Sequence, residues 1–111
     1  MSKHRDDIIL NDIPNAGRLI VEFVEDTEQD IFVDDWKTRS AVLYQLTVVG
    51  EAGKRLSTEF RAANGQIPWA LMAGMRDHLV HGYDLVDWDE VWKTATDDIP
   101  ELLKKIGQLT G

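Results

Sequence analysis

The spacing of apolar residues near the start of the chain constrains the fold more than any other feature of the sequence. Apolar side chains recur there in steps of four and three residues, at Ile9, Ile13, Ala16, Ile20 and Phe23. This period matches one face of an α-helix and not the alternation of a strand. It predicts a helix from Arg5 to Val24, bent near Pro14 because proline removes one backbone N–H donor.

A second helix is expected after an acidic connection at Glu25 to Asp30. Its start is predicted at Asp34 or Asp35, and its apolar set is Trp36, Leu43, Leu46, Val49 and Leu56. Gly50 and Gly53 fall within this helix, and a glycine in mid-helix most often permits close backbone packing.

Two more helices are expected in the second half of the chain. The third should start at Pro68, which suits a first helical position, and end at Gly82. Its buried stripe is predicted to be Trp69, Met72, Met75 and Leu79. The fourth should start at Asp87, with Glu90 in an acidic first turn, and be kinked or split by Pro100. Its apolar face is predicted to be Val91, Ala95, Ile99, Leu102 and Ile106.

Length and composition fit such a bundle. At 111 residues the chain suits one domain, 1–111, whose modest core a second copy would help to stabilise. No stretch shows strand alternation, so we predict an all-α fold, a four- to five-helix up-and-down bundle. The chain has no cysteine for disulfides, no signal-peptide pattern at its start and no apolar run of membrane-spanning length. We therefore expect a cytoplasmic protein that does not contact a membrane.

The net charge of −8 argues against nucleic-acid binding, which normally shows as a basic surface. The acidic residues are unevenly distributed, however. Residues 51–83 hold four basic and three acidic side chains, together with His78 and His81. This window leaves room for a locally positive cleft on an acidic body.

The segment from Arg76 to Tyr83 is the strongest candidate for chemistry. On a continuous helix, at about 100° per residue, Arg76 and Tyr83 share a face, Asp77 lies one turn before His81, and Arg76 and His81 are about 140° apart. Arg76 and His81 could meet if the helix unwinds at Gly82, if the long arginine side chain reaches around, or if a second copy contributes across a two-fold axis. The last possibility would make a dimer the active unit.

These residue types suit RNA cleavage without a metal ion. Such cleavage needs a base for the 2′-hydroxyl proton, an acid for the leaving oxygen and a cation for the charge on the phosphate oxygens. His81 can serve as acid or base near neutral pH, and Arg76 can bind phosphate through its planar fork. Asp77 could fix the tautomer of His81.

Structural roles remain open for the same residues. Arg76 could simply pair with an acidic neighbour, and Tyr83 could pack its ring while its hydroxyl stays in water. A metal-binding face is a weaker alternative, because the chain lacks cysteine or a wider ligand set; its members would be His78, His81, Asp84 and Asp87. No cofactor and no metal are expected.

The sequence resembles the HepT family, within the wider group of HEPN domains, over almost the whole chain. The resemblance is carried by the motif Arg-x4-His-x-Tyr, here Arg76, His81 and Tyr83. Further matching blocks are Ile67-Pro68-Trp69, Gly74-Met75-Arg76, Gly50-Glu51-Ala52, Trp92 and Ile99-Pro100-Glu101-Leu102.

The resemblance implies a metal-independent endoribonuclease toxin that acts on RNA, not DNA. It implies a homodimer in which the motif arginine and histidine, here Arg76 and His81, line a cleft at the interface. It also implies an antitoxin partner, a minimal nucleotidyltransferase of the MntA type, which transfers AMP from ATP to Tyr83. One departure is Asp77, since close relatives usually have asparagine after the motif arginine.

A different class of function fits part of the same pattern. The chain could be a non-catalytic helical subunit that docks to a nucleotidyltransferase and presents its substrate, or a plain helical dimerisation domain. The set of Arg76, His81 and Tyr83 favours the toxin, because a scaffold has no physical need for it. In the toxin, the dimer is expected to bury a third-helix face around Met75, Leu79 and Tyr83.

Overall fold

The expected all-α fold is confirmed by a computed structural model, which describes residues 2–77 and 83–110. Within these residues every regular element is helical. The described helices include none that is long and apolar enough to span a membrane.

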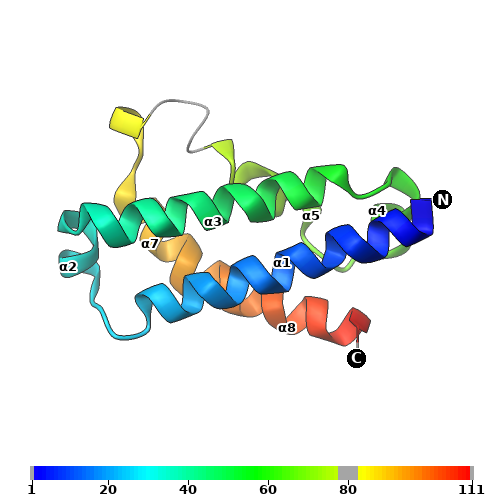
Figure 1. Ribbon diagram of the computed structural model, residues 1–111, viewed down its shortest axis with the longest axis horizontal. Helices are drawn as coiled ribbons and strands as arrows, with labels where there is room; N and C mark the ends of the chain where they lie inside the picture. Colours follow the sequence, from blue (N-terminus) through cyan, green and yellow to red (C-terminus); the bar gives the residue numbers. More distant parts are fainter. Residues whose placement is uncertain (1, 78–82, 111) are drawn as a thin grey trace.

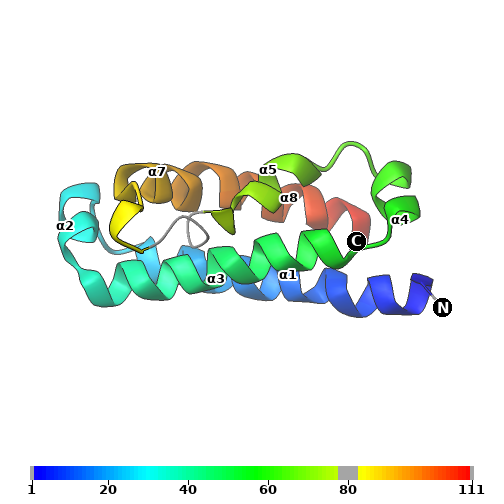
Figure 2. The ribbon, with the colours of Figure 1, turned by 90° about the horizontal axis from the view of Figure 1, so that it is seen from above.

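Two long helices form one layer of the molecule. α1 (Ser2–Val24) and α3 (Trp36–Arg55) run antiparallel, side by side, over most of their length (Figures 1 and 2). The short helix α2 (Gln29–Asp34) lies at the corner between them, and α4 (Thr58–Ala63) follows α3 at the opposite end.

The second layer contains the remaining helices (Figure 2). It consists of α5 (Trp69–Gly74), α7 (Trp88–Lys93), the single π-helical turn η2 (Thr94–Asp98) and α8 (Ile99–Thr110). A 3-10 turn, η1 (Tyr83–Leu85), precedes α7. α7, η2 and α8 follow one another without a break, and α8 ends at the same end of the molecule at which α1 begins (Figure 1).

The core lies between the two layers and follows the predicted helical faces. On α1 the predicted residues are buried from Ile9 to Ile20, with Phe23 half-buried, and on α3 Leu43, Leu46 and Val49 are buried. All five predicted apolar residues of the last segment, Val91, Ala95, Ile99, Leu102 and Ile106, are also buried.

The local signals at the ends of helices are confirmed in part. Asp35 caps α3 by accepting from the backbone N–H of Thr38, and Asp87 caps α7 by accepting from two backbone N–H groups. Pro100 follows the π-helical turn η2, so the last segment is interrupted where expected. A proline lacks the N–H that would bond the carbonyl four residues earlier, and a π-helical turn accommodates such a missing bond.

Two expectations for the first half of the chain were wrong. The connection expected at Glu25 to Asp30 is shorter, because α2 starts at Gln29 and buries Phe32 against Trp92, with ring centroids 5.2 Å apart. Trp36, expected in the core, is 68% exposed. Phe32 fills the core at that end of α3 instead.

The region after α3 also differs from the expectation. Leu56 is buried but lies beyond the end of α3, and α4 follows as a separate helix capped by the Ser57 hydroxyl, which accepts from the N–H of Phe60. The third helix was expected to reach Gly82; α5 ends at Gly74, Asp77 is helical again, and Gly82 lies outside the described residues. Glycine has a low helix propensity, which favours termination at Gly74.

Candidate functional site

Arg76 lies in the turn that follows α5, and its position depends on a glycine of α3. Met75 ends α5 by donating its backbone N–H to the carbonyl of Met72. A Cβ atom at Gly50 would stand 2.9 Å from the backbone nitrogen of Arg76 and 3.2 Å from the carbonyl oxygen of Met72. The absence of a side chain at Gly50 therefore lets the two backbones touch, as the sequence indicated for a mid-helix glycine.

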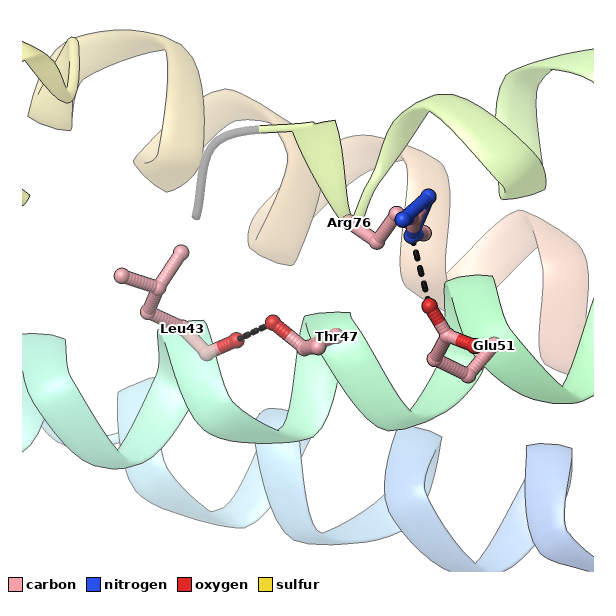
Figure 3. Close-up of polar contacts among 4 residues, drawn as sticks. All are labelled: Leu43, Thr47, Glu51 and Arg76. Carbon is pink, nitrogen blue, oxygen red and sulfur yellow. Dashed lines mark hydrogen bonds and ion pairs between the residues drawn. The ribbon is translucent and has the colours of Figure 1, made fainter. Parts of the chain in front are cut away.

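The side chain of Arg76 is held by the residue that follows Gly50. Nε of Arg76 lies 2.5 Å from Oε1 of Glu51 (Figure 3). The Arg76 side chain is 29% exposed and that of Glu51 is 50% exposed, so the pair sits at the surface. Among the described residues, the guanidinium makes no second ion pair. Within this described part of the chain, the terminal nitrogens can therefore still donate to an anion.

Pairing with an acidic neighbour was one of the roles that the sequence allowed for Arg76, and the ion pair with Glu51 confirms that role. Glu51 belongs to a sequence block that matches the family, but the sequence alone gives it no role. The neighbouring Gly50 and Glu51 in the middle of a helix were the available signal for this contact. Their partner could not be identified, because Arg76 is distant in sequence and lies in the turn after another helix.

A shallow hollow on α3 adjoins this ion pair. Asp12 of α1 lines it, together with residues of α3, which are Tyr44, Thr47, Val48, Glu51, Ala52 and Arg55. The Thr47 hydroxyl donates to the Leu43 carbonyl one turn earlier (Figure 3). Two carboxylates and one guanidinium line this hollow, so its own residues do not form the positive cleft that the charge distribution left room for.

The other predicted site residues are described only in part. Asp77 is exposed beside Arg76. His81, together with His78, lies outside the described residues, and Tyr83 is described only as the first residue of η1. The proximity of Arg76 to His81 therefore stays a prediction.

The possible metal-binding face is tested only at its described members. Across residues 2–77 and 83–110, the acidic and histidine side chains form no cluster of three that could hold an ion. Asp87 has a structural role, because it caps α7. His78 and His81 of the predicted face lie outside the described residues.

The dimer face expected from the sequence was wrong at Met75. This side chain is 3% exposed and belongs to the core of a single chain, because the turn after α5 faces inward there. It cannot be buried a second time by a partner.

Comparisons with known proteins place the chain in a family. The family described as "Ribonuclease HepT-like" matches residues 13–109. A protein of Thermococcus cleftensis named "Probable ribonuclease HepT" is 42% identical over 96% of this chain and 94% of its own length. A protein of Methanocaldococcus jannaschii named as a candidate RNase is 31% identical over 96% of this chain and 97% of its own length.

A third relative comes from Caldanaerobacter subterraneus and is also named as a candidate RNase. It is 37% identical over 90% of this chain and 89% of its own length. No solved structure matches the chain significantly. The agreement of the family match with relatives that cover nearly the whole chain shows that this protein belongs to the HepT-like ribonuclease family.

Proposed function

We propose that this chain is a metal-independent endoribonuclease toxin, with Arg76 and His81 as its catalytic residues. The observation that carries the proposal is the state of Arg76: its side chain is partly exposed, it is held through Nε, and no second acidic residue among those described pairs with it. A guanidinium in this state can bind the phosphate of an RNA chain in a bidentate manner.

In the proposed reaction, the RNA 2′-oxygen attacks the adjacent phosphorus and the bond to the 5′-oxygen breaks. His81 takes the 2′-hydroxyl proton, and a histidine donates a proton to the leaving oxygen. Arg76 stabilises the charge that develops on the non-bridging oxygens. Asp77, four residues before His81, accepts a hydrogen bond from its ring and so fixes the tautomer.

The proposal includes a homodimer, in which the second copy supplies the second histidine. An exposed strip on α3 supports such an interface: Trp36 is 68% and Tyr44 is 66% exposed. Tyr44 and Glu51 are seven residues apart, which places them on the same face of α3. A second copy that covers this strip would bring its own Arg76 towards the first.

The proposed regulator is an antitoxin of the MntA type, a minimal nucleotidyltransferase that transfers AMP to Tyr83. Tyr83 follows His81 by two residues, which supports a modification close to the reacting groups. An adenylyl group there would bring a bulky anion near Arg76.

Cleavage of RNA by the purified protein, in the presence of a metal chelator, tests the proposed activity. We expect Arg76→Ala and His81→Ala each to lower cleavage by on the order of 10²- to 10³-fold. Arg18→Ala is the matched control, since Arg18 is an exposed arginine of α1 that bonds only Asn15 among the described residues. Circular dichroism should show the same helical content in all four proteins.

Expression in a bacterial host gives the second readout. Growth should slow with the unchanged protein and recover with Arg76→Ala or His81→Ala. Growth arrest that survives both substitutions would contradict the nuclease proposal and favour the non-catalytic docking subunit.

A further inference from the structure

The contact between Glu51 and Arg76 uses only one edge of the guanidinium. The contact joins Oε1 of Glu51 to Nε of Arg76, at 2.5 Å (Figure 3). A guanidinium has five N–H donors, four of them on its two terminal nitrogens, so a carboxylate at Nε does not use all of them. Among the described residues no second acidic side chain pairs with this guanidinium, so its terminal nitrogens can donate to an anion.

We propose that Glu51 is a positioning residue that fixes the guanidinium of Arg76 with its terminal nitrogens turned towards the scissile phosphate. This inference rests on the proposed ribonuclease function, and it assigns a role to a residue outside the Arg76, His81 and Tyr83 set. Glu51 itself does not touch the RNA.

Two consecutive residues of α3 hold Arg76 at two different points. Gly50 admits the Arg76 backbone, since its Cβ would stand 2.9 Å from Arg76 N and 3.0 Å from Arg76 Cβ. Glu51 then binds the far end of the same side chain. A side chain fixed at its root and at Nε has few rotamers left, so less entropy is lost when it binds phosphate.

The carboxylate of Glu51 has a second, opposite effect. Its negative charge lies beside the cation and weakens the attraction of an RNA phosphate for the site. The effect of Glu51 on the orientation of Arg76 can therefore be measured separately from the effect of its charge. Loss of the orientation lowers kcat, whereas loss of the negative charge lowers KM.

Two substitutions separate these effects. We expect Glu51→Ala to lower kcat on the order of tenfold, because a misplaced catalytic group loses transition-state stabilisation, while KM stays the same or falls. We expect Glu51→Gln to keep kcat within about threefold of the unchanged protein, because glutamine retains an acceptor oxygen for Nε–H. Its KM should fall as well, since the charge is gone.

Glu22 supplies the matched control. It is an exposed carboxylate on α1 and forms no ion pair among the described residues. Glu22→Ala and Glu22→Gln change the net charge by the same amount and should leave kcat unchanged. If Glu51→Ala keeps or raises kcat, or if Glu51→Gln loses as much kcat as Glu51→Ala, the inference is overturned.

A spectroscopic measurement separates this inference from the proposed function. The Nε–H resonance of Arg76, assigned by its loss in Arg76→Lys, should exchange slowly with water in the unchanged protein and in Glu51→Gln, and rapidly in Glu51→Ala. If the protein does not cleave RNA, the proposed function fails, while this resonance still decides whether Glu51 holds the guanidinium. Equal exchange in Glu51→Ala and the unchanged protein would overturn the positioning role even in an active enzyme.

Discussion

Gly50 lies directly against the backbone of Arg76: a Cβ atom there would stand 2.9 Å from the backbone nitrogen of Arg76. That distance is shorter than any comfortable contact, and the neighbouring atom is backbone rather than the end of a flexible side chain. Gly50→Ala must therefore separate α3 from the turn after α5. We expect it to lower the free energy of unfolding by about 1–3 kcal/mol, as overpacking does. The molecules that remain folded should also cleave RNA more slowly.

Two other glycines are matched controls for this substitution in urea denaturation. A Cβ at Gly53 would meet the Met72 Sδ at 2.8 Å, and a thioether can move. Gly107 is exposed within α8 and has nothing within 4 Å of such a Cβ. Gly107→Ala should stabilise the protein by about 1 kcal/mol through helix propensity. A Gly50→Ala protein as stable as Gly107→Ala would contradict the close packing.

Asp6 is a buried carboxylate, and it should make the stability of the protein vary with pH in the acidic range. It is 3% exposed and accepts from the backbone N–H of Ser57 at 2.8 Å and from its hydroxyl at 2.6 Å. These two hydrogen bonds lower the pKa of Asp6 below its ordinary value of 3.8. The stabilisation is therefore complete above the unfolded pKa and is lost as the pH falls through the lower, folded pKa.

Asp6→Ala tests this dependence by thermal unfolding between pH 7 and pH 2. The melting temperature should be lower than that of the unchanged protein at neutral pH, because the cap of α4 loses its acceptor. The difference should shrink as the pH falls below the ordinary aspartate pKa and towards the lower pKa of folded Asp6, where the carboxylate of the unchanged protein takes up a proton. A difference that does not vary with pH would show that the carboxylate charge contributes nothing.

Asp98 should have the opposite effect on stability. Partial burial, followed by the negative charges of Asp97 and Glu90, raises its pKa above the ordinary value of 3.8. A raised folded pKa means that ionisation destabilises the folded state once the pH rises above the unfolded pKa. We expect Asp98→Asn to raise the melting temperature at pH 7 and to lose that gain as the pH falls below about 4. Asp97→Asn, which changes an exposed neighbour, should give a smaller gain.

The exposed strip on α3 predicts how the proposed dimer can be broken. Tyr44→Glu and Trp36→Glu would each place a charge on a surface that the second copy covers, and a buried unpaired charge is costly. We expect both variants to sediment as monomers at micromolar concentration, with cleavage strongly reduced. Ile8→Glu is the control, because Ile8 is 55% exposed on α1, outside this strip. Retained dimers in both α3 variants would place the interface elsewhere.

The parts of the fold that could be predicted from the sequence depend on contacts that are local along the chain. Ile9, Ile13 and Ile20 are buried on one helical face because that face is set by residues three and four apart. Asp87 could be predicted as a helix cap because its partners, the backbone N–H groups of Asp89 and Glu90, follow it by two and three residues. α2 was missed because a six-residue helix is stabilised by tertiary packing, here of Phe32 on Trp88 and Trp92, and not by propensity.

The site was predicted through its motif and missed where it depends on tertiary contacts. Arg76 was identified as a candidate because a cation, histidine and tyrosine occur together in a short segment. Its partner Glu51 could not be paired with it, because the two residues are far apart in sequence and meet only when α3 packs against the turn after α5. The end of α5 at Gly74 was missed although it has a local signal, the low helix propensity of glycine.

The last prediction concerns control of the proposed activity through Tyr83. AMP attached to its hydroxyl should abolish RNA cleavage, because the added phosphate competes with the RNA phosphate for the open terminal nitrogens of Arg76. The adenylyl group is also bulky, so the block should persist at high salt, where a purely electrostatic block would fade. Co-expression with an MntA-type nucleotidyltransferase should add the mass of one or more AMP units, and Tyr83→Phe should prevent this while keeping nuclease activity. Mass spectrometry that places AMP on another residue, or a modified protein that still cuts RNA, would exclude Tyr83 as the point of control.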